Sequence, residues 1–303
     1  MAKQKHKMKY KDRDWGFDVV NYAISIVVLL IVLYPLVYIL SASFSDPFRV
    51  AGGDMWLWPV GLTIEGFERL FGYSEIWLGY MNTIIYTVGG TVVSLAVTLP
   101  CAYALSRKDF VGRGILMTMI MITMFISGGL IPTYINIKNL GLTDTRTLMF
   151  ITGLTSAYHL IVSRTFFAST IPAELQESGR IDGCSDTRLF LQIILPLSKP
   201  IIAVMAMYFG VAKWNEYFTP MIYLKTRAFF PLQLFLREIL IQDQVAAEMI
   251  TDVELAESLA QRARISAMIK YTSIIVSTLP MIIVYPWIQK FFIKGVMIGA
   301  IKG

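Results

Sequence analysis

The sequence predicts an all-α integral membrane protein with six transmembrane helices. Hydrophobic residues make up 55% of the chain and charged residues only 16%, whereas an average soluble domain has about 25% charged residues. Six apolar stretches approach or exceed the roughly 20 helical residues that cross a hydrocarbon core of about 30 Å. The stretches are continuous rather than alternating, so helices are favoured over the strands of a membrane barrel.

The first three stretches run over residues 19–40, 81–105 and 114–137. The first follows a lysine-rich start, so a cleaved signal peptide is an alternative interpretation. The apolar region of a signal peptide has about 7–15 residues, whereas this stretch has 22 and contains Pro35. We therefore expect an uncleaved first span.

The last three stretches run over residues 147–163, 201–224 and 271–289. The fourth is short, and the fifth contains Lys213 and Glu216. Charge at the centre of a bilayer costs roughly 2.5–3.5 kcal/mol, so ionisable residues within a membrane usually face a cavity or a partner helix. We therefore expect the charged residues of the fifth span to face a cavity or a partner helix.

The placement of Lys and Arg predicts the orientation, because basic residues concentrate on the cytoplasmic side of a membrane protein. With the N-terminus inside, the inner segments hold sixteen basic and eight acidic residues, and the outer segments hold ten and twelve. Residues 1–18, the loop 170–200 and the tail 290–303 are then cytoplasmic. Because the basic residues flank the spans on one side, the net charge of +6 does not indicate a nucleic-acid partner. Lipid headgroups are the expected contact of the basic start.

We expect a single membrane domain over residues 1–303, without an internal repeat or a soluble appendage. The outer segment 225–270 is longer than a simple connection needs. Its residues 243–264 are rich in Glu, Ala, Gln and Leu and predict a surface helix. Two interpretations of this segment stay open: a solvated cap, or a docking surface for a soluble partner on the outer side.

A polar, helix-forming segment lies between the fourth and fifth stretches, on the predicted inner side. Pro172 suits the first turn of a helix, and the acidic Glu174 and Glu177 favour the N-terminal end of that helix. Asp182-Gly183 has the composition of a turn, and Ser185 is suited to cap a second helix. The segment therefore predicts a helix–turn–helix elbow.

The elbow should lie along the membrane face and end where the chain re-enters the membrane. Pro196 and Pro200 are expected to bend or end its second helix there. Its corner consists of small residues that another protein could approach closely. Glu177 is placed to pair with Arg180 at a spacing of three residues, or to bond backbone groups across the elbow.

This elbow resembles the EAA coupling loop of ABC importer permeases. Glu177-Ser178-Gly179 is followed after three residues by Gly183, and after nine more by Ile193-Ile194-Leu195-Pro196. These match the E-A-A, glycine and I-x-L-P elements of the family, except that Ser178 and Gly179 replace two alanines. The resemblance implies a type I ABC importer permease fold, in which this loop docks on an ATPase. The residues to which it assigns this coupling are Glu174, Glu177, Ser178, Gly179, Arg180, Asp182, Gly183, Ile193, Leu195 and Pro196.

The resemblance extends over nearly the whole chain. Asn82-Thr83, the run AYALSR at residues 102–107, and Trp214-Asn215-Glu216 look like carbohydrate permeases of the maltose-transporter class. The C-terminal tail is similar to that of the six-span subunit of that class, so Lys302 and Gly303 are expected to contact the ATPases. Residues 127–142 look closest to permeases for complex oligosaccharides, including glycans that contain uronic acids. We expect Trp214, Asn215 and Glu216 to face the translocation pathway or the interface between permeases.

Membership of this family implies a set of partners in the bacterial cytoplasmic membrane. The chain would pair with a second, homologous permease, and the pair would sit on a dimer of ATPases. A soluble binding protein, often lipid-anchored, would deliver an oligosaccharide to the outer face. ATP and Mg²⁺ would bind to the ATPases, so we expect no cofactor in this chain.

The sequence carries no catalytic motif of its own. The dipeptide Gly-Lys is absent, so there is no Walker A phosphate loop. HExxH, GxSxG and a clustered Cys/His set are also absent, so we expect neither a catalytic site nor a metal site. The lone His159 is expected to be a packed residue with a hydrogen-bond partner.

Two other classes of function compete with an importer subunit. An ion-coupled secondary sugar transporter would carry paired acidic residues in broken helices, whereas Glu216 is the only carboxylate within a predicted span. A membrane enzyme acting on lipid-linked sugars would need catalytic carboxylates or a metal cluster at the membrane surface. The hypothesis of an importer subunit accounts for both the elbow and the composition.

Overall fold

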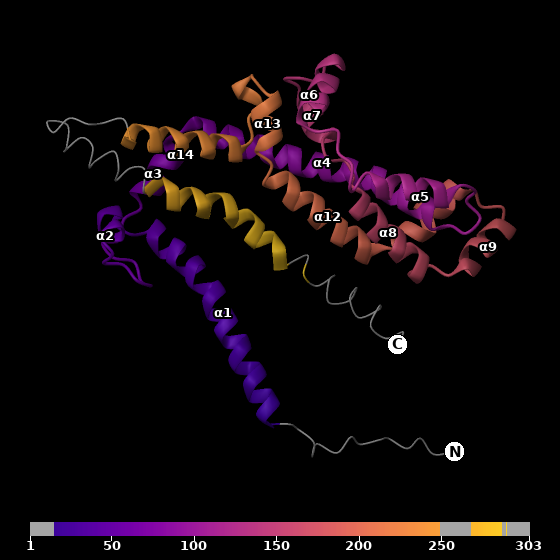
Figure 1. The fold of residues 1–303 in the computed structure, drawn as a ribbon, viewed down its shortest axis with the longest axis horizontal. Coiled ribbons are helices and arrows are strands. Elements are labelled where there is room, and N and C mark those ends of the chain that lie inside the picture. Colours follow the sequence, from indigo (N-terminus) through magenta and orange to yellow (C-terminus); the bar gives the residue numbers. More distant parts are fainter. Residues whose placement is uncertain (1–14, 249–267, 287–288, 290–303) are drawn as a thin grey trace. The chain divides into compact units, whose positions relative to one another are not determined.

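The computed structural model describes residues 15–248, 268–286 and 289 (Figure 1). The regular structure within these residues is entirely helical, which confirms the predicted fold class. The chain divides into two compact units, Met1–Leu70 with Asp243–Ile275, and Phe71–Gln242 with Val276–Gly303.

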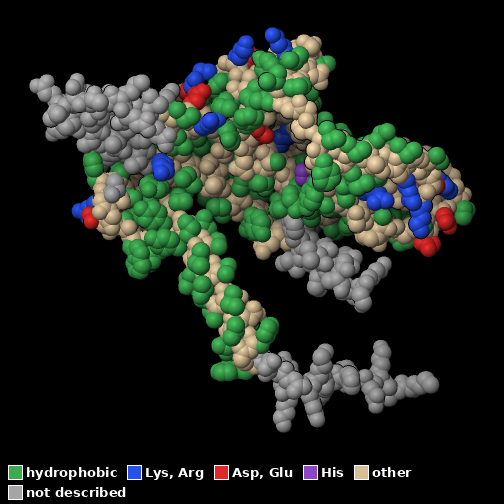
Figure 2. Space-filling model, in the orientation of Figure 1, with side chains coloured by type: hydrophobic (Ala, Val, Ile, Leu, Met, Phe, Trp, Pro, Cys, Tyr) green, Lys and Arg blue, Asp and Glu red, His purple; other side chains and the backbone are tan. Residues whose placement is uncertain are grey.

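The first unit contains a long apolar helix, α1 (Trp15–Ser43), with the short helices α2 (Pro47–Ala51) and α3 (Glu65–Gly72). Helix α1 includes the predicted first span, and its 29 residues are long and apolar enough to cross a membrane. Hydrophobic side chains cover its surface (Figure 2). Because the described chain buries only the C-terminal end of α1, the rest of this helix has the exterior of one that meets lipid or another protein subunit.

The second unit is built around α4 (Ser74–Ser106), which includes the predicted second span. It packs against α12 (Lys199–Trp214), α8 (Ala157–Thr170) and α7 (Arg146–Ile151). The buried face of α4 carries small or polar residues at intervals of three to four, which lets neighbouring backbones approach closely. They are Gly79, Asn82, Thr83, Tyr86, Gly90, Ser94 and Thr98.

Shorter helices complete this unit (Figure 1). Two follow α4 and precede α7: α5 (Arg113–Ile122) and α6 (Leu130–Asn139). The elbow segment forms α9 (Ala173–Ile181), α10 (Asp186–Leu189), the π-helical turn η1 (Phe190–Ile194) and α11 (Leu195–Leu197). After α12 come α13 (Phe218–Tyr223), the 3₁₀ turn η2 (Arg227–Phe229) and α14 (Leu232–Glu248).

Three described helices are long and apolar enough to span a membrane: α1, α4 and Met268–Pro286. A fourth candidate joins Asp186–Leu197 to α12 through a bend of 84°. The predicted third and fourth spans are each broken into two helices, near Gly129 and Gly153, whose φ angles are +81° and +64°. Such angles suit glycine and interrupt a helix. The count of six crossings therefore stays a prediction.

The start of the predicted outer segment is fastened to α4. The side-chain amide of Asn82 donates to the carbonyls of Ala228 and Phe230, both at 2.9 Å. The hydroxyl of Thr83 accepts from the backbone N–H of Leu232 at 2.8 Å. The adjacent pair Asn82-Thr83 therefore sets where α14 begins, well before the surface helix predicted over residues 243–264. Residues 249–264 of that prediction lie outside the described residues.

Lys213 ties α12 to the broken fourth span. Its Nζ donates to the carbonyl of Met149 at 2.8 Å and to that of Thr152, at the C-terminal end of α7. Its aliphatic stem crosses α4 at Gly90, where an added Cβ would lie 2.9 Å from Lys213 Cε. A cation at the C-terminal end of a helix also interacts favourably with the helix dipole. This explains how a lysine is held inside an apolar helix bundle.

Replacing Lys213 with Met should destabilise the chain, because two buried carbonyls lose their donor. Each unsatisfied group costs roughly 1–3 kcal/mol, so the thermal midpoint of the purified chain in detergent should fall by several degrees. Lys199→Met, at the exposed start of the same helix, is the matched control. Equal thermal midpoints for the two variants would contradict this role of Lys213.

Candidate coupling site

The elbow turns on a glycine whose backbone conformation other residues rarely adopt. Helix α9 ends at Ile181, and Gly183 follows with a φ of +69°. The N–H of Gly183 donates to the Arg180 carbonyl at 3.0 Å, and the N–H of Cys184 donates to the Gly179 carbonyl at 2.9 Å. This pair of bonds is the Schellman motif, in which a left-handed glycine closes a helix. The predicted Asp182-Gly183 turn is thereby confirmed in its geometry.

The second arm of the elbow starts with the predicted cap and ends in a sharp bend. Ser185 Oγ accepts from the N–H of Arg188 at 3.3 Å and so caps α10. The chain then widens into the π-helical turn η1 just before Pro196, whose nitrogen has no hydrogen to donate. At Ser198 it bends by 84° into α12, which confirms the predicted change of direction between Pro196 and Pro200.

The two arms pack against each other at Gly179. A Cβ at this position would lie 2.9 Å from Leu189 Cδ1, and Leu189 is buried. Glycine therefore allows the closest approach of α9 to α10. Leu189 in turn belongs to a core cluster with Tyr103 of α4 and Phe167 of α8. The elbow is thus packed onto the helices from which it projects.

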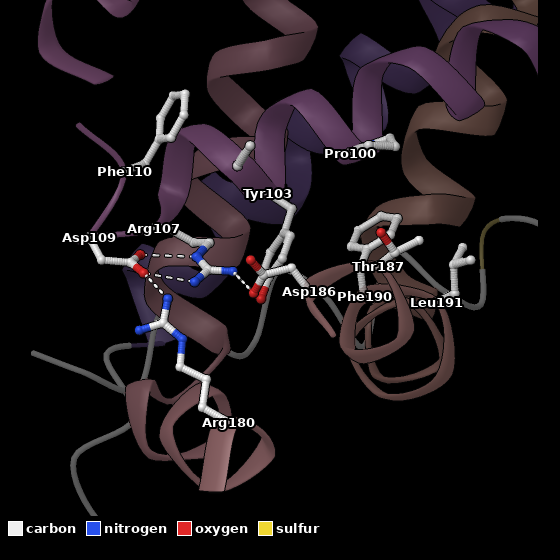
Figure 3. A pocket seen from close by; sticks show the side chains of 11 residues that line it. Pro100, Tyr103, Arg107, Asp109, Phe110, Arg180, Asp186, Thr187, Phe190 and Leu191 are labelled. Atoms are coloured by element: carbon white, nitrogen blue, oxygen red, sulfur yellow. Dashed lines mark hydrogen bonds and ion pairs between the residues drawn. The ribbon is translucent and has the colours of Figure 1, made fainter. Parts of the chain in front are cut away.

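Four charged side chains lock the elbow onto the end of α4 (Figure 3). Arg107, which follows the last residue of α4, binds Asp109 through two bonds of 3.0 and 2.7 Å. Its third bond, at 2.5 Å, reaches Asp186 at the start of α10. Arg180 of α9 also donates to Asp109. We call these four residues the ion cluster.

Arg107 is the centre of the ion cluster, because its side chain is only 9% exposed and contacts both carboxylates. Its hydrogen bonds hold the pKa of the Asp109 carboxyl well below the usual range, with a smaller contribution from Arg180. The bond to Asp109 likewise raises the pKa of the Arg107 guanidinium. Asp109 and Arg107 are therefore both ionised at neutral pH, and charge-assisted bonds of this kind are stronger than neutral ones.

Two hollows are lined by residues of the ion cluster. One, of about 480 Å³, is lined by Tyr103, Phe110 and Phe190 as well as by the charged side chains (Figure 3). The other, of about 540 Å³, is lined by Glu174 and Glu177 of α9. The first is mainly apolar and the second mainly polar.

The remaining elbow residues are distributed between its exposed and packed faces. Glu174, Glu177 and Ser178 are exposed. The possible Glu177–Arg180 pair is not formed: Arg180 binds Asp109, and the Glu177 carboxylate has no ion pair or hydrogen bond with another described residue. Ile193 packs on the core cluster, as does Leu195.

Arg107, Asp109 and Asp186 were not predicted as residues of the site. Arg107 ends the AYALSR run in the sequence, and its partners lie 2 and 79 positions away. A signal was present nevertheless: the predicted topology places all three residues on the same inner side.

The membrane residues singled out by the sequence make contacts within the chain. Trp214 is buried and its indole N–H donates to the Ser277 carbonyl at 2.8 Å. Glu216 accepts from the N–H of Thr219 at 3.0 Å, next to the start of α13. Asn215 is exposed. Their place on a pathway or permease interface stays a prediction, and Lys302 and Gly303 lie outside the described residues.

Among the described residues, no group of three or more His, Cys, Asp or Glu side chains could hold a metal ion. The elbow presents an exposed corner at Gly183 on a support that the ion cluster holds to α4.

Comparison with known proteins gives matches along almost the full chain. It is 36% identical over 287 residues to the polygalacturonan/rhamnogalacturonan transport system permease protein YtcP of Bacillus subtilis (strain 168), covering 95% of this chain and 98% of that protein. It is 35% identical over 287 residues to the protein LplC of the same organism, covering 95% of each. No family model matches the chain.

Among solved structures, the chain matches one from a bacterial ABC transporter that imports the acidic polysaccharide alginate. The TM-score is 0.81 at 33% sequence identity, and the match covers 94% of this chain and 99% of that one. The helical architecture of the two proteins is therefore shared over nearly their whole length.

Replacing Gly183 with Trp should abolish coupling while leaving the chain inserted and folded. The left-handed conformation costs a non-glycine residue roughly 1–2 kcal/mol. Apart from the two adjacent residues, no part of the described chain lies within 4 Å of where its Cβ would be. The ring would therefore fill space that a docked protein needs. Uptake in membrane vesicles should fall at least about tenfold, whereas Gly183→Asn, which tolerates this conformation, should keep most activity. Normal uptake in the Trp variant would contradict a docking role.

Asp109→Asn should loosen the elbow, because it removes the carboxylate shared by two arginines. We expect coupled ATP hydrolysis to fall several-fold in the assembled complex while the amount of inserted chain is unchanged. Asp54→Asn, an exposed carboxylate of the first unit, is the control. If both variants hydrolyse ATP like wild type, the ion cluster has no part in coupling.

The pH dependence of the ion cluster follows from the lowered pKa of Asp109. A carboxylate whose folded pKa lies below its unfolded value of about 3.9 stabilises the fold fully above that value and loses its effect as pH falls through the folded pKa. The difference in thermal midpoint between wild type and Asp109→Asn should therefore be constant from about pH 5 to 8. It should shrink only below about pH 4, and a midpoint difference that changed near pH 6 would argue against this assignment.

Proposed function

Because the chain belongs to the permease subunits of sugar-importing ABC transporters, we propose that it forms half of the membrane pathway of an ATP-driven oligosaccharide importer. It is a multi-pass protein of the cell membrane, and its role is transport. The elbow is the observation that best supports this proposal. Its exposed corner is Gly183, which has a left-handed backbone conformation. The rest of the elbow is bound to α4 by the ion cluster and is continuous with α12. Such a corner is suited to transmit the displacement of a docked protein to the membrane helices.

We propose that the partners are those of a binding-protein-dependent importer. A second, homologous permease would complete the pathway, and a dimer of ATPases would bind ATP and Mg²⁺ beneath it. A soluble binding protein would deliver the sugar to the outer face. The absence of a Walker A loop from this sequence supports an energy source in a partner subunit.

In this mechanism the ATPase binds the corner of the elbow on the cytoplasmic side. Glu174 and Glu177 are exposed beside the polar hollow and available to basic groups of the ATPase. When the ATPases close on ATP, their displacement reaches α4 through Arg107 and α12 through the bend at Ser198. Since α4 and α12 pack together, both helices move as one element. The tail at Lys302 and Gly303 would add a second contact with the ATPases.

We propose that the substrate is an oligosaccharide derived from a glycan that contains uronic acids. The support comes from the relatives: YtcP is described as a polygalacturonan/rhamnogalacturonan permease, and the matching structure is from an importer of acidic alginate. The cognate binding protein provides the test. It should bind oligogalacturonides or related acidic oligosaccharides more tightly than neutral ones of equal length, and the opposite preference would exclude this substrate class.

A purified, tagged chain should carry a second permease and an ATPase with it, since each contributes a required part. In liposomes, ATP hydrolysis by the complex should rise several-fold when binding protein and sugar are added together. A cysteine at position 177 should react with a membrane-impermeant reagent only from the cytoplasmic side. Labelling from the outside would overturn the orientation, and ion-driven uptake without ATP would favour a secondary transporter.

A further inference from the structure

The mainly apolar hollow beside the ion cluster takes no part in the coupling described above. Arg107, Asp109 and Arg180 gather at one end of it, and Pro100 and Leu191 lie at the other (Figure 3). We call this hollow of about 480 Å³ the graded hollow, because its lining changes from charged to apolar along its length. Coupling uses only the charged end, so the apolar end calls for a separate explanation.

The polarity of the graded hollow changes in the direction that a membrane requires. Arg107 directly follows α4, at the predicted inner end of the second span, whereas Pro100 lies within that span. The two residues are seven positions apart, or roughly 10 Å along a helix. In the predicted orientation the charged end therefore lies at the level of the inner headgroups and the apolar end lies deeper in the bilayer. A phospholipid has the same order of polar and apolar parts.

The graded hollow has a packed floor and an exposed rim. The stacked rings of Tyr103 and Phe190 have centroids 5.2 Å apart, and both residues are buried in the core cluster. At the rim, Leu191 is 54% exposed and Phe110 is 39% exposed. An acyl chain that crossed the floor would cover these exposed apolar groups, which is favourable.

The charged end has hydrogen-bond donors to spare. Arg180 is 55% exposed and donates one bond, to Asp109, so its other N–H groups have no acceptor among the described residues. Residues 107–113 and 180–192 hold five basic and three acidic residues, which leaves this end with net positive charge. Lys108 is exposed and has no ion pair within the described chain. Basic pockets at the cytoplasmic side of membrane helices bind anionic lipid headgroups.

We propose that the graded hollow binds an anionic phospholipid of the inner leaflet. The phosphate accepts hydrogen bonds from the free N–H groups of Arg180, and Lys108 adds positive charge. One acyl chain crosses the rings of Tyr103 and Phe190 toward Pro100. The bound lipid thus bridges α4 and the second arm of the elbow. This inference does not depend on which solute the chain transports.

The second permease is the competing occupant of the graded hollow. The core of a protein–protein interface is depleted of charged residues, whereas this hollow joins an aromatic floor to guanidinium donors. A small soluble anion would use the charged end and leave the exposed Leu191 and Phe110 uncovered. An amphipathic anion uses both ends, and the inner leaflet supplies such molecules directly beside the hollow.

Photo-crosslinking provides the test. The photoreactive residue p-benzoylphenylalanine replaces Leu191 in the full chain, which is reconstituted with the subunits that co-purify with it. The liposomes hold equal amounts of phosphatidylglycerol and phosphatidylcholine, and mass spectrometry identifies the adducts after irradiation. The phosphatidylglycerol adduct should exceed the phosphatidylcholine adduct at least about fivefold. The same residue at Ile181, an 86% exposed position at the other end of α9 from its membrane entry, should give no such preference.

Two pairs of variants separate the apolar end from the charged end. Leu191→Glu places a negative charge beside the acyl chain, so phosphatidylglycerol retained by the purified chain should fall at least about fivefold. The matched Leu191→Gln should stay within about twofold of wild type. Lys108→Gln should lower the preference for phosphatidylglycerol over phosphatidylcholine about threefold, whereas Lys138→Gln, an exposed lysine of α6, should not change it. An unchanged thermal midpoint shows that each variant is folded.

Three results would overturn the lipid site. Equal yields of the two lipid adducts at position 191 would show contact with bulk lipid and no bound anion. An adduct with another subunit in place of lipid would assign the graded hollow to a subunit interface. Wild-type retention of phosphatidylglycerol by both Leu191→Glu and Lys108→Gln would place the retained lipid elsewhere on the chain.

Discussion

The site depends on one buried guanidinium. Arg107 directly follows α4 and neutralises Asp109 and Asp186, while Asp109 also binds Arg180 of α9. A buried charge that loses its partner is strongly destabilising, so the arms of the elbow do not leave α4 without exposing or stranding this cation. The elbow is therefore a rigid extension of α4, although it is connected to it in sequence only through a long intervening chain.

A second connection runs through the chain itself. The second arm of the elbow passes by η1 and the bend at Ser198 into α12, which packs along α4. Lys213, near the far end of α12, fastens that helix to the carbonyls at the end of α7. In the proposed coupling, a displacement at Gly183 would enter two packed helices at one end and reach the broken fourth span at the other. The polar residues within the bundle serve to keep these helices in register.

Local sequence signals predicted the local geometry well. The glycine turn, the Ser185 cap and the bend between two prolines all follow from single residues whose backbone preferences are strong. The long helices α1 and α4 follow from continuous hydrophobicity. The ion cluster was not predicted, because tertiary packing brings together Arg107 and Asp186, which lie 79 positions apart in the sequence. The breaks near Gly129 and Gly153 were also missed, since average hydropathy does not register a single left-handed glycine.

The π-helical turn η1 gives this connection a tolerance to length. A turn of this kind holds one residue more than the α-helix that it interrupts. Deleting one residue from Phe190–Ile194 would let the chain form an ordinary helix of nearly unchanged hydrophobicity. The helix faces on either side would then keep about the same relative orientation, because the π turn had absorbed the additional residue. Deleting one residue from the regular helix α12 would instead rotate the faces on either side by about 100°.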